Sequence, residues 1–164
     1  MRRTKSTKRK GFDIPGMKSM KCPCCGSAVH LRSADGIYRE NSGNTQLYVC
    51  SKYPECDAYV RVHPGTATPM GSLANPQLRA LRTKTHRQFD RLHESGLMTR
   101  KDAYGWLAHM LQSPLSQAHI GYLSEYYCNL IIEESGKVLE RYKWKLAAGR
   151  PLEPAMGGEY RAAQ

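Results

Sequence analysis

Five of the six cysteines lie in two short runs whose spacing is typical of a metal site. The runs are CPCCG at residues 22–26 and CSKYPEC at residues 50–56. Zinc binds four thiolates in a tetrahedral arrangement, and two cysteines separated by two residues can wrap around one ion. In the first run the outer cysteines have that spacing, and the second run supplies the other pair. We therefore predict one structural Zn²⁺ ion, bound by Cys22, Cys25, Cys50 and Cys56.

The first run contains one cysteine more than such a site needs. Cys24 is an alternative ligand in place of either neighbour, although the spacing favours the outer pair. His30 and His63 are alternative nitrogen ligands, but alternation along a strand accounts for both without a metal. Reduced thiols without any metal are the remaining alternative, and such a cluster would be prone to oxidation. Cys128 lies in an apolar helical pattern and is expected in the core.

Four thiolate ligands also indicate what the metal does. Hydrolytic zinc sites keep one coordination position open for water and usually use histidine or carboxylate ligands. A closed site with four thiolates is instead typical of a structural ion that holds together a small β module. The metal is thus expected to support the fold, and the functional surface is expected elsewhere.

The composition points to a polyanionic partner and excludes several classes of protein. The chain has 164 residues and a formal net charge of +11, which suits nucleic acid first and an anionic membrane surface second. No window approaches about 18 consecutive apolar residues, and no apolar segment follows the basic N-terminus, so neither a membrane span nor a secretory signal is predicted. We expect a cytoplasmic protein, where thiols stay reduced, with no membrane partner and no small-molecule substrate.

Composition shifts along the chain predict an α+β protein with five segments. Residues 1–20 are basic and poor in apolar residues, which predicts a disordered arm. Residues 21–63 are predicted to form a β-rich zinc ribbon, and residues 64–76, rich in proline and glycine, a linker or an extended wrap. Residues 77–146 have helical periodicity and are expected to form a three-helix unit, followed by a flexible tail at 147–164.

The predicted elements follow from periodicity and from capping residues. Short β-like runs occupy residues 28–32, 37–39, 46–49 and 58–63. Asn75 is expected to cap a helix that begins at Pro76 and ends near Gly96. Thr99, with Asp102 three residues later, is expected to cap a second helix. A third helix is expected to begin near Ser124, with Gly136 as a weak point inside it.

The cysteine runs carry a family resemblance. The order C-P-x-C-G, a strand pair, then C-S-x-Y-P-x-C resembles the zinc ribbons at the C-terminal end of bacterial type IA DNA topoisomerases, over residues 20–63. Tyr53 and Pro54 occupy the Y-P positions. The resemblance implies binding to single-stranded DNA or contact with RNA polymerase. The extra Cys24 departs from the pattern, and the chain has no topoisomerase catalytic domain, so strand passage is excluded.

A longer likeness covers residues 20–135. The ribbon followed by VHPGTATPMGSLANPQLRALRTKTHRQFD, SGLMTRKDAYGWLA and AHIG is similar to a family of small bacterial and phage zinc-finger-containing proteins. This likeness implies an architecture rather than an activity.

Nucleic-acid binding by a non-catalytic accessory protein, with DNA favoured over RNA, is the main functional hypothesis. Lysine and arginine follow phosphates, and tyrosines stack on unpaired bases. The basic arm, the ribbon and the first helix supply such side chains, although helices carry charged outer faces anyway and ribbon tyrosines often cover a small core. The predicted contacts are Arg2, Arg3, Lys5, Lys8, Arg9, Lys10, Tyr53, Tyr59, Arg61, Lys84, Arg87 and Arg91.

Two alternatives come from other functional classes. The first is a protein–protein adaptor that docks on a larger complex such as RNA polymerase or a phage or defence assembly, using the acidic stretch 102–140 and the pair Tyr126 and Tyr127. The second is an enzyme or a second metal site around His86, His93 and Asp90, with His119 as a further candidate. Solvated histidines on a basic helix, and a histidine that buttresses a turn, account for the same residues more simply.

Overall fold

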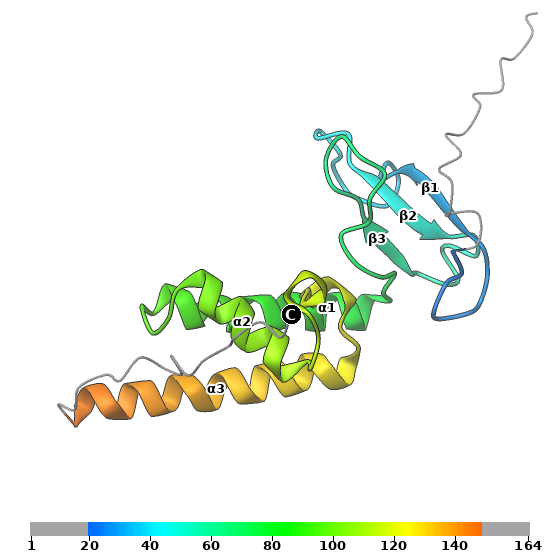
Figure 1. Cartoon of the computed structure of the whole chain (residues 1–164). Coiled ribbons are helices and arrows are strands. Elements are labelled where there is room, and N and C mark those ends of the chain that lie inside the picture. Colours follow the sequence, from blue (N-terminus) through cyan, green and yellow to red (C-terminus); the bar gives the residue numbers. More distant parts are fainter. Residues whose placement is uncertain (1–19, 149–164) are drawn as a thin grey trace, which may run out of the picture.

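The computed structural model describes residues 20–148 and has an α+β architecture (Figure 1). A three-stranded antiparallel sheet comes first in the chain and three α-helices follow it, which confirms the predicted fold class. The predicted arm, up to residue 19, and the predicted tail, from residue 149, lie outside the described residues.

The sheet is ordered β1-β2-β3, with strands Val29–Ser33, Gln46–Cys50 and Tyr59–Arg61. Central strand β2 is the most buried, because alternate residues of a strand point to opposite faces and both faces are covered. Leu47 and Val49 belong to one small hydrophobic cluster, and Tyr48 and Cys50 belong to another. The cysteine at the end of β2 is therefore anchored in a buried strand.

The strand predicted at residues 37–39 is wrong. The backbone N–H groups of Ile37 and Tyr38 both donate to the carbonyl of Ala34, at 3.0 and 2.9 Å, and close a turn. A single bridge pairs Asp35 with Tyr38. Ile37 and Tyr38 pack against the cluster around Leu47, so the turn rather than a strand accounts for their apolar character.

After β3 the chain makes a turn at residues 64–66, in which the Thr66 N–H donates to the His63 carbonyl at 3.0 Å, and residues 67–75 then run in extended form to the first helix. Isolated bridges pair Val62 with Pro69 and Tyr59 with Ala74. Leu73 and Ala74 are buried, at 3% and 1% exposure. The segment therefore packs on the ribbon at these two bridges and through Leu73.

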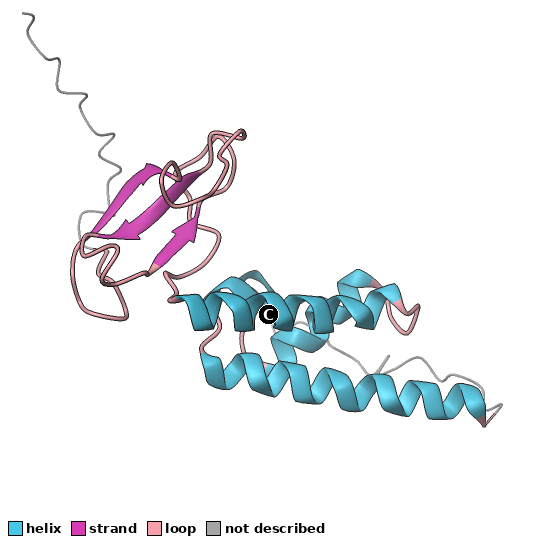
Figure 2. Ribbon diagram, turned by 180° about the vertical axis from the view of Figure 1, so that it is seen from behind, coloured by secondary structure: helices cyan, strands magenta, loops and turns pink. Residues whose placement is uncertain are grey.

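The helical unit contains α1 (Pro76–Glu94), α2 (Arg100–Met110) and α3 (Glu125–Ala147), with short 3₁₀ turns η1 (Leu115–Gln117) and η2 (Ile120–Tyr122). Helices α1 and α3 run away from the ribbon and α2 returns toward it (Figures 1 and 2).

Both predicted caps of the helical unit are confirmed. The Asn75 side chain accepts from the Leu78 backbone N–H at 2.9 Å, and the Thr99 hydroxyl accepts from that of Asp102 at 3.1 Å. Such bonds satisfy backbone donors that have no partner inside the helix.

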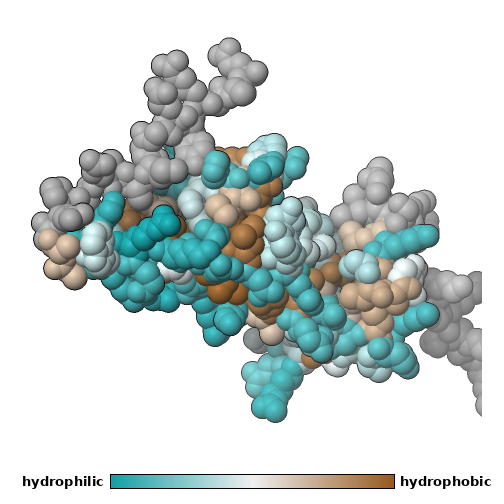
Figure 3. All heavy atoms as spheres, turned by 90° about the horizontal axis from the view of Figure 1, so that it is seen from below, coloured by the Kyte–Doolittle hydropathy of each residue, from teal (hydrophilic) through white to brown (hydrophobic). Residues whose placement is uncertain are grey.

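The core of the helical unit is made only of residues from α1 onward. Phe89, Leu107, Ile120 and Ile131 are almost completely buried in it. Cys128 is fully buried in the same cluster, as the apolar pattern predicts. Seen from below, hydrophilic side chains cover much of the molecule, and hydrophobic surface remains exposed between them over the helices (Figure 3).

Candidate metal centre

The first cysteine pair is held by a tight turn before β1. The Gly26 N–H donates to the Cys22 carbonyl at 2.8 Å, and the Cys22 N–H donates to the Ser27 carbonyl at 2.8 Å. Gly26 has φ of +72°, a left-handed conformation that glycine adopts without steric cost. The turn brings both ends of the pair to the same side of the chain.

The second pair lies at the end of β2 and in the turn that follows it. The Tyr53 N–H donates to the Cys50 carbonyl and the Cys56 N–H to the Lys52 carbonyl, each at 3.0 Å. These bonds fold the intervening residues into consecutive turns, so that Cys56 returns to the neighbourhood of Cys50.

The structure brings the four sulfurs of Cys22, Cys25, Cys50 and Cys56 within 4.8 Å of one another. The Cys22 and Cys56 sulfurs are 3.7 Å apart, and those of Cys25 and Cys50 are 3.4 Å apart. A tetrahedral ion with metal–sulfur bonds of about 2.3 Å places its sulfurs about 3.8 Å apart. The four thiols therefore fit one structural zinc ion.

The electrostatics of the four thiols differ. Hydrogen bonds from the side chain and backbone of Ser27 lower the pKa of Cys25 to about 6, so that the thiolate forms readily. Burial and the neighbouring thiols raise the pKa of Cys56. Zinc binding requires thiolates and releases protons, so the ion would supply the positive charge that keeps the whole group ionised.

The alternative ligands lie outside this group. Cys24 is exposed and is not one of the four clustered cysteines. His30 and His63 are also exposed. Among residues 20–148, no other group of three or more histidine, cysteine, aspartate or glutamate side chains lies close enough to share an ion.

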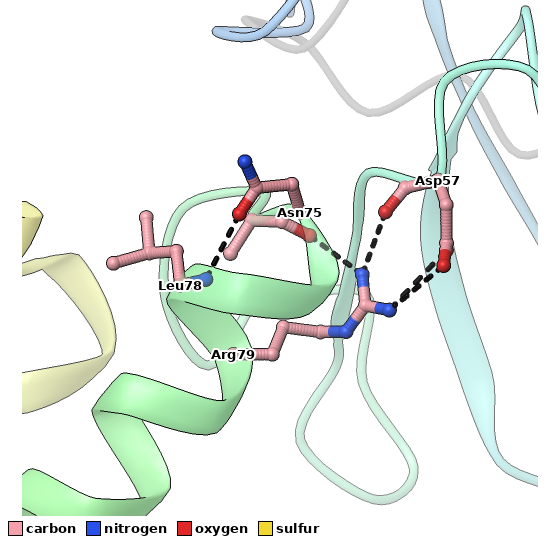
Figure 4. Close-up of polar contacts among 5 residues, drawn as sticks. Asp57, Asn75, Leu78 and Arg79 are labelled. Atoms are coloured by element: carbon pink, nitrogen blue, oxygen red, sulfur yellow. Dashed lines mark hydrogen bonds and ion pairs between the residues drawn. The ribbon is translucent and has the colours of Figure 1, made fainter.

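A contact that the sequence did not predict joins Asp57 to Arg79 of α1 (Figure 4). The Arg79 guanidinium donates to the backbone carbonyls of Asp57 and Ala74, each at 2.7 Å, and reaches the Asp57 carboxylate at 3.2 Å. Asp57 directly follows the metal-site residue Cys56. Arg79 also lies over the Tyr59 ring, 3.7 Å from its centroid.

Arg82 makes a second unpredicted contact and is only 9% exposed. Its Nε donates to the Leu123 carbonyl at 2.9 Å, and its terminal nitrogens donate to the carbonyl and the hydroxyl of Ser72, each at 2.8 Å. Helical spacing could have predicted this burial. Arg82 lies four residues after Leu78 and seven before Phe89, which places it on the core-facing side of α1.

The residues predicted to contact nucleic acid are dispersed. Those in the N-terminal arm, Arg2, Arg3, Lys5, Lys8, Arg9 and Lys10, lie outside the described residues. Lys84, Arg87 and Arg91 are exposed on α1 and Arg61 is exposed on β3. Tyr53 and Tyr59 are half-buried against the cluster around Leu47, and Arg79 covers one face of the Tyr59 ring.

Within residues 20–148, the histidines considered for catalysis do not form a metal-binding group with Asp90, although that carboxylate pairs with His93 and acts electrostatically on His86. His93 lies 3.4 Å from the Asp90 carboxylate. His86 and His119 instead line a separate cleft between the ribbon and the helices.

Comparison with known proteins agrees with the metal chemistry. Residues 18–138 match the family described as zinc-finger-containing domain. Comparison with curated proteins gave no match, and neither did comparison with solved structures. No helix within residues 20–148 has the length and apolar character needed to cross a bilayer.

Proposed function

The chain belongs to the zinc-finger-containing domain family, and from this we propose that it is a zinc-ribbon accessory protein that binds nucleic acid without catalysing a reaction. The closed four-thiolate centre supports the fold and has no open position for a substrate. We also propose a cytoplasmic location, because clustered thiols stay reduced there.

The observation that carries the proposal is a basic strip on α1, defined here as Lys84, Arg87 and Arg91. Their spacing of three and four residues places them on one side of the helix, away from buried Phe89 and Leu92. Residues 76–101 contain seven basic and two acidic residues. Such a strip can follow a phosphate backbone, and the basic arm would add to its field.

DNA is favoured over RNA by the resemblance of residues 20–63 to topoisomerase zinc ribbons. In those enzymes the ribbons bind single-stranded DNA or contact RNA polymerase. The covered face of the Tyr59 ring makes that residue less suited to stacking on a base. The proposal therefore rests on phosphate contacts from the basic strip more than on the ribbon tyrosines.

A protein–protein adaptor is the second candidate, and one observation favours it. Tyr126 is 70% exposed and Tyr127 is 40% exposed, and their rings meet edge to face with centroids 5.2 Å apart. Exposed aromatic residues are enriched at protein interfaces. Residues 102–140, with five acidic residues and one lysine, would give such a surface a charge opposite to that of the basic strip.

The test measures binding of a labelled single-stranded oligonucleotide of mixed sequence by fluorescence anisotropy across a salt series. The variant K84A/R87A/R91A removes the basic strip, and K137A/R141A/K143A removes the same charge from α3 as a control. We expect the first variant to bind at least tenfold more weakly and to reduce the salt slope by about 2, at roughly 0.7 per phosphate contact on a single strand. Equal losses in both variants, or no binding at low salt, would contradict the proposal.

A further inference from the structure

A cleft of about 720 Å³ lies between the ribbon and the helical unit. One wall comes from the extended segment after β3, including Met70, and the other from the connection that contains η1 and η2. His86 of α1 and Tyr104 of α2 complete it. This volume falls in the range of ligand-binding clefts, which are common between structural units.

The two walls of the cleft are joined by direct backbone contact. The Ser72 N–H donates to the Gly121 carbonyl at 3.0 Å. A Cβ atom at Gly71 would lie 2.1 Å from the Gly121 carbonyl oxygen, so only glycine allows this approach. Buried Arg82 holds the same two segments through Ser72 and Leu123. Backbone and side-chain contacts therefore hold the two walls of the cleft together.

The side chains that line the cleft have a distinctive chemistry. Three are histidines, His63, His86 and His119, and two are tyrosines, Tyr104 and Tyr122. Within residues 20–148, the side chains of His63, His119 and Tyr122 make no hydrogen bond or ion pair, and His86 lies in the field of the Asp90 carboxylate, one turn further along α1. No carboxylate, lysine or arginine lines the cleft in the described part of the chain.

This lining selects among classes of ligand. A cation would be expected to meet a carboxylate, and the three imidazoles do not lie close enough to share a metal ion. A phosphate group would be expected to meet lysine or arginine. Flat rings together with imidazole and amide hydrogen-bonding groups instead suit an uncharged heterocycle, since a nucleobase has an apolar face and polar edges.

A second, smaller hollow of about 340 Å³ adjoins the cleft. The two share His63, and the smaller one is lined by Arg61 at the end of β3. Arg61 is exposed and carries a charge suited to a phosphate. An uncharged aromatic cleft beside an arginine matches the alternation of base and phosphate along a nucleic-acid strand.

We propose that the cleft binds one unpaired base of a single-stranded nucleic acid, with the adjoining backbone phosphate on Arg61. The base stacks on the exposed ring of Tyr122, since Phe89 and Arg100 already contact the ring of Tyr104, and the histidines and Gln117 meet the polar edge of the base. The proposal rests on the nucleic-acid function argued above and adds to it a base-binding site distinct from the basic strip.

The first experiment separates base binding from phosphate binding. Anisotropy is measured with an oligothymidine and with the same oligomer made abasic, which keeps every phosphate. We expect wild type to bind the oligothymidine about tenfold more tightly than the abasic strand, and Tyr122→Ala to lose most of that difference. Tyr126→Ala, an exposed tyrosine outside the cleft, is the matched control and should keep it. An unchanged difference in Tyr122→Ala overturns the proposal.

The second experiment distinguishes two negative results: no base binding in the cleft, and no nucleic-acid binding at all. Thymidine monophosphate is titrated into ¹⁵N-labelled protein, and amide shifts are followed by NMR. Shifts concentrated at residues 63–70 and 116–122 support the cleft even if long oligonucleotides bind weakly. Oligonucleotide binding that depends on the basic strip, without any shifts in those two segments, would leave the proposed function standing and refute the cleft.

Discussion

The guanidinium of Arg79 lies on the ring of Tyr59, 3.7 Å from its centroid, and thereby joins the first turn of α1 to the last strand of the ribbon. The same side chain donates to both the carbonyl and the carboxylate of Asp57, the residue after Cys56. Arginine suits this position because its planar group stacks and donates in several directions at once. One residue of the helical unit therefore contacts the ribbon next to the metal centre.

We expect Arg79→Ala to lower the free energy of unfolding by about 1–2 kcal/mol, because a stacking contact and several charge-assisted hydrogen bonds are lost. The estimate is modest because the Arg79 and Asp57 side chains are 24% and 37% exposed, so solvent screens the ion pair. Chemical denaturation of the zinc-loaded protein measures the change. NMR contacts between the start of α1 and Tyr59 should weaken in the same variant.

Two variants control for charge and for helix propensity in that experiment. Asp57→Asn keeps the backbone acceptor and removes only the carboxylate, so its loss should be smaller than that of Arg79→Ala. Arg87→Ala removes an exposed arginine from the same helix and should change stability by no more than about 0.5 kcal/mol. A loss in Arg87→Ala equal to that in Arg79→Ala would refute the contact as the cause.

Removal of any one of the four clustered cysteines should abolish zinc binding. We expect Cys22→Ser, Cys25→Ser, Cys50→Ser and Cys56→Ser each to reduce the metal content well below one ion per chain, measured by mass spectrometry of purified protein. The ribbon should lose its dispersed NMR signals, because the ion holds a module with only small hydrophobic clusters.

Cys24→Ser is the matched control, since it removes a neighbouring exposed thiol. It should retain one zinc ion per chain. Helical circular dichroism should also persist in the zinc-free variants, because the helical core contains no residue of the ribbon. Zinc loss in Cys24→Ser equal to that in the other variants would mean that the ligand set has been misassigned.

A methyl group at Gly71 should strain the close backbone contact between Gly71 and Gly121, which joins the segment after β3 to the helical unit. The added Cβ would collide with backbone atoms of Gly121, so Gly71→Ala is expected to cost about 1–3 kcal/mol, as overpacking typically does. Gly105→Ala, inside α2, is the matched control. No atom lies within 4 Å of its added Cβ, and helix propensity should make this change stabilising by about 0.5–1 kcal/mol. Thermal unfolding of both variants should therefore shift in opposite directions, and parallel shifts would contradict the close approach.

The turn after β1 should have a pH-dependent contribution to stability. The Ser33 hydroxyl and the Asn41 amide donate to the Asp35 carboxylate, at 2.6 and 2.9 Å, and lower the pKa of Asp35 in the folded state. Because these bonds favour the ionised form, their stabilisation is present above the pKa of the unfolded state. It is lost as the pH falls through the lower folded-state pKa.

Ser33→Ala should therefore raise the pKa of Asp35 toward its ordinary value, as measured by NMR titration of the carboxyl carbon. Ser51→Ala, an exposed serine outside this turn, should leave it unchanged. If the pKa of Asp35 is the same in Ser33→Ala and in wild type, the hydroxyl is not the principal cause of the shift.

Sequence reasoning succeeded where the controlling interactions are local. Asn75 and Thr99 were identifiable as caps because each bonds a backbone group three residues later. The prediction failed at residues 37–39, since two apolar residues beside a turn sequence have the same pattern as a short strand. There the backbone donors reach back to Ala34 instead of across to a neighbouring strand.

The contacts between the two units could not be predicted in the same way. Arg79 meets Asp57 across 22 residues and Arg82 meets Leu123 across 41, so neither pairing has a local signature. Arginines in a basic segment look like solvated charges until the fold buries them. The cleft was missed for the same reason, because His63, His86 and His119 come together only when the extended segment folds back onto the helices.

The bridge between Tyr59 and Ala74 determines how the two units can move. Two backbone hydrogen bonds, of 3.3 and 3.2 Å, pair these residues, and Asn75, the cap of α1, follows immediately. Only Asn75 lies between the bridge and the first residue of α1, and its side chain is held by the helix cap. Rotation of the ribbon about α1 would have to break the bridge, and the metal-bound module and the first helix should therefore reorient as a single rigid body.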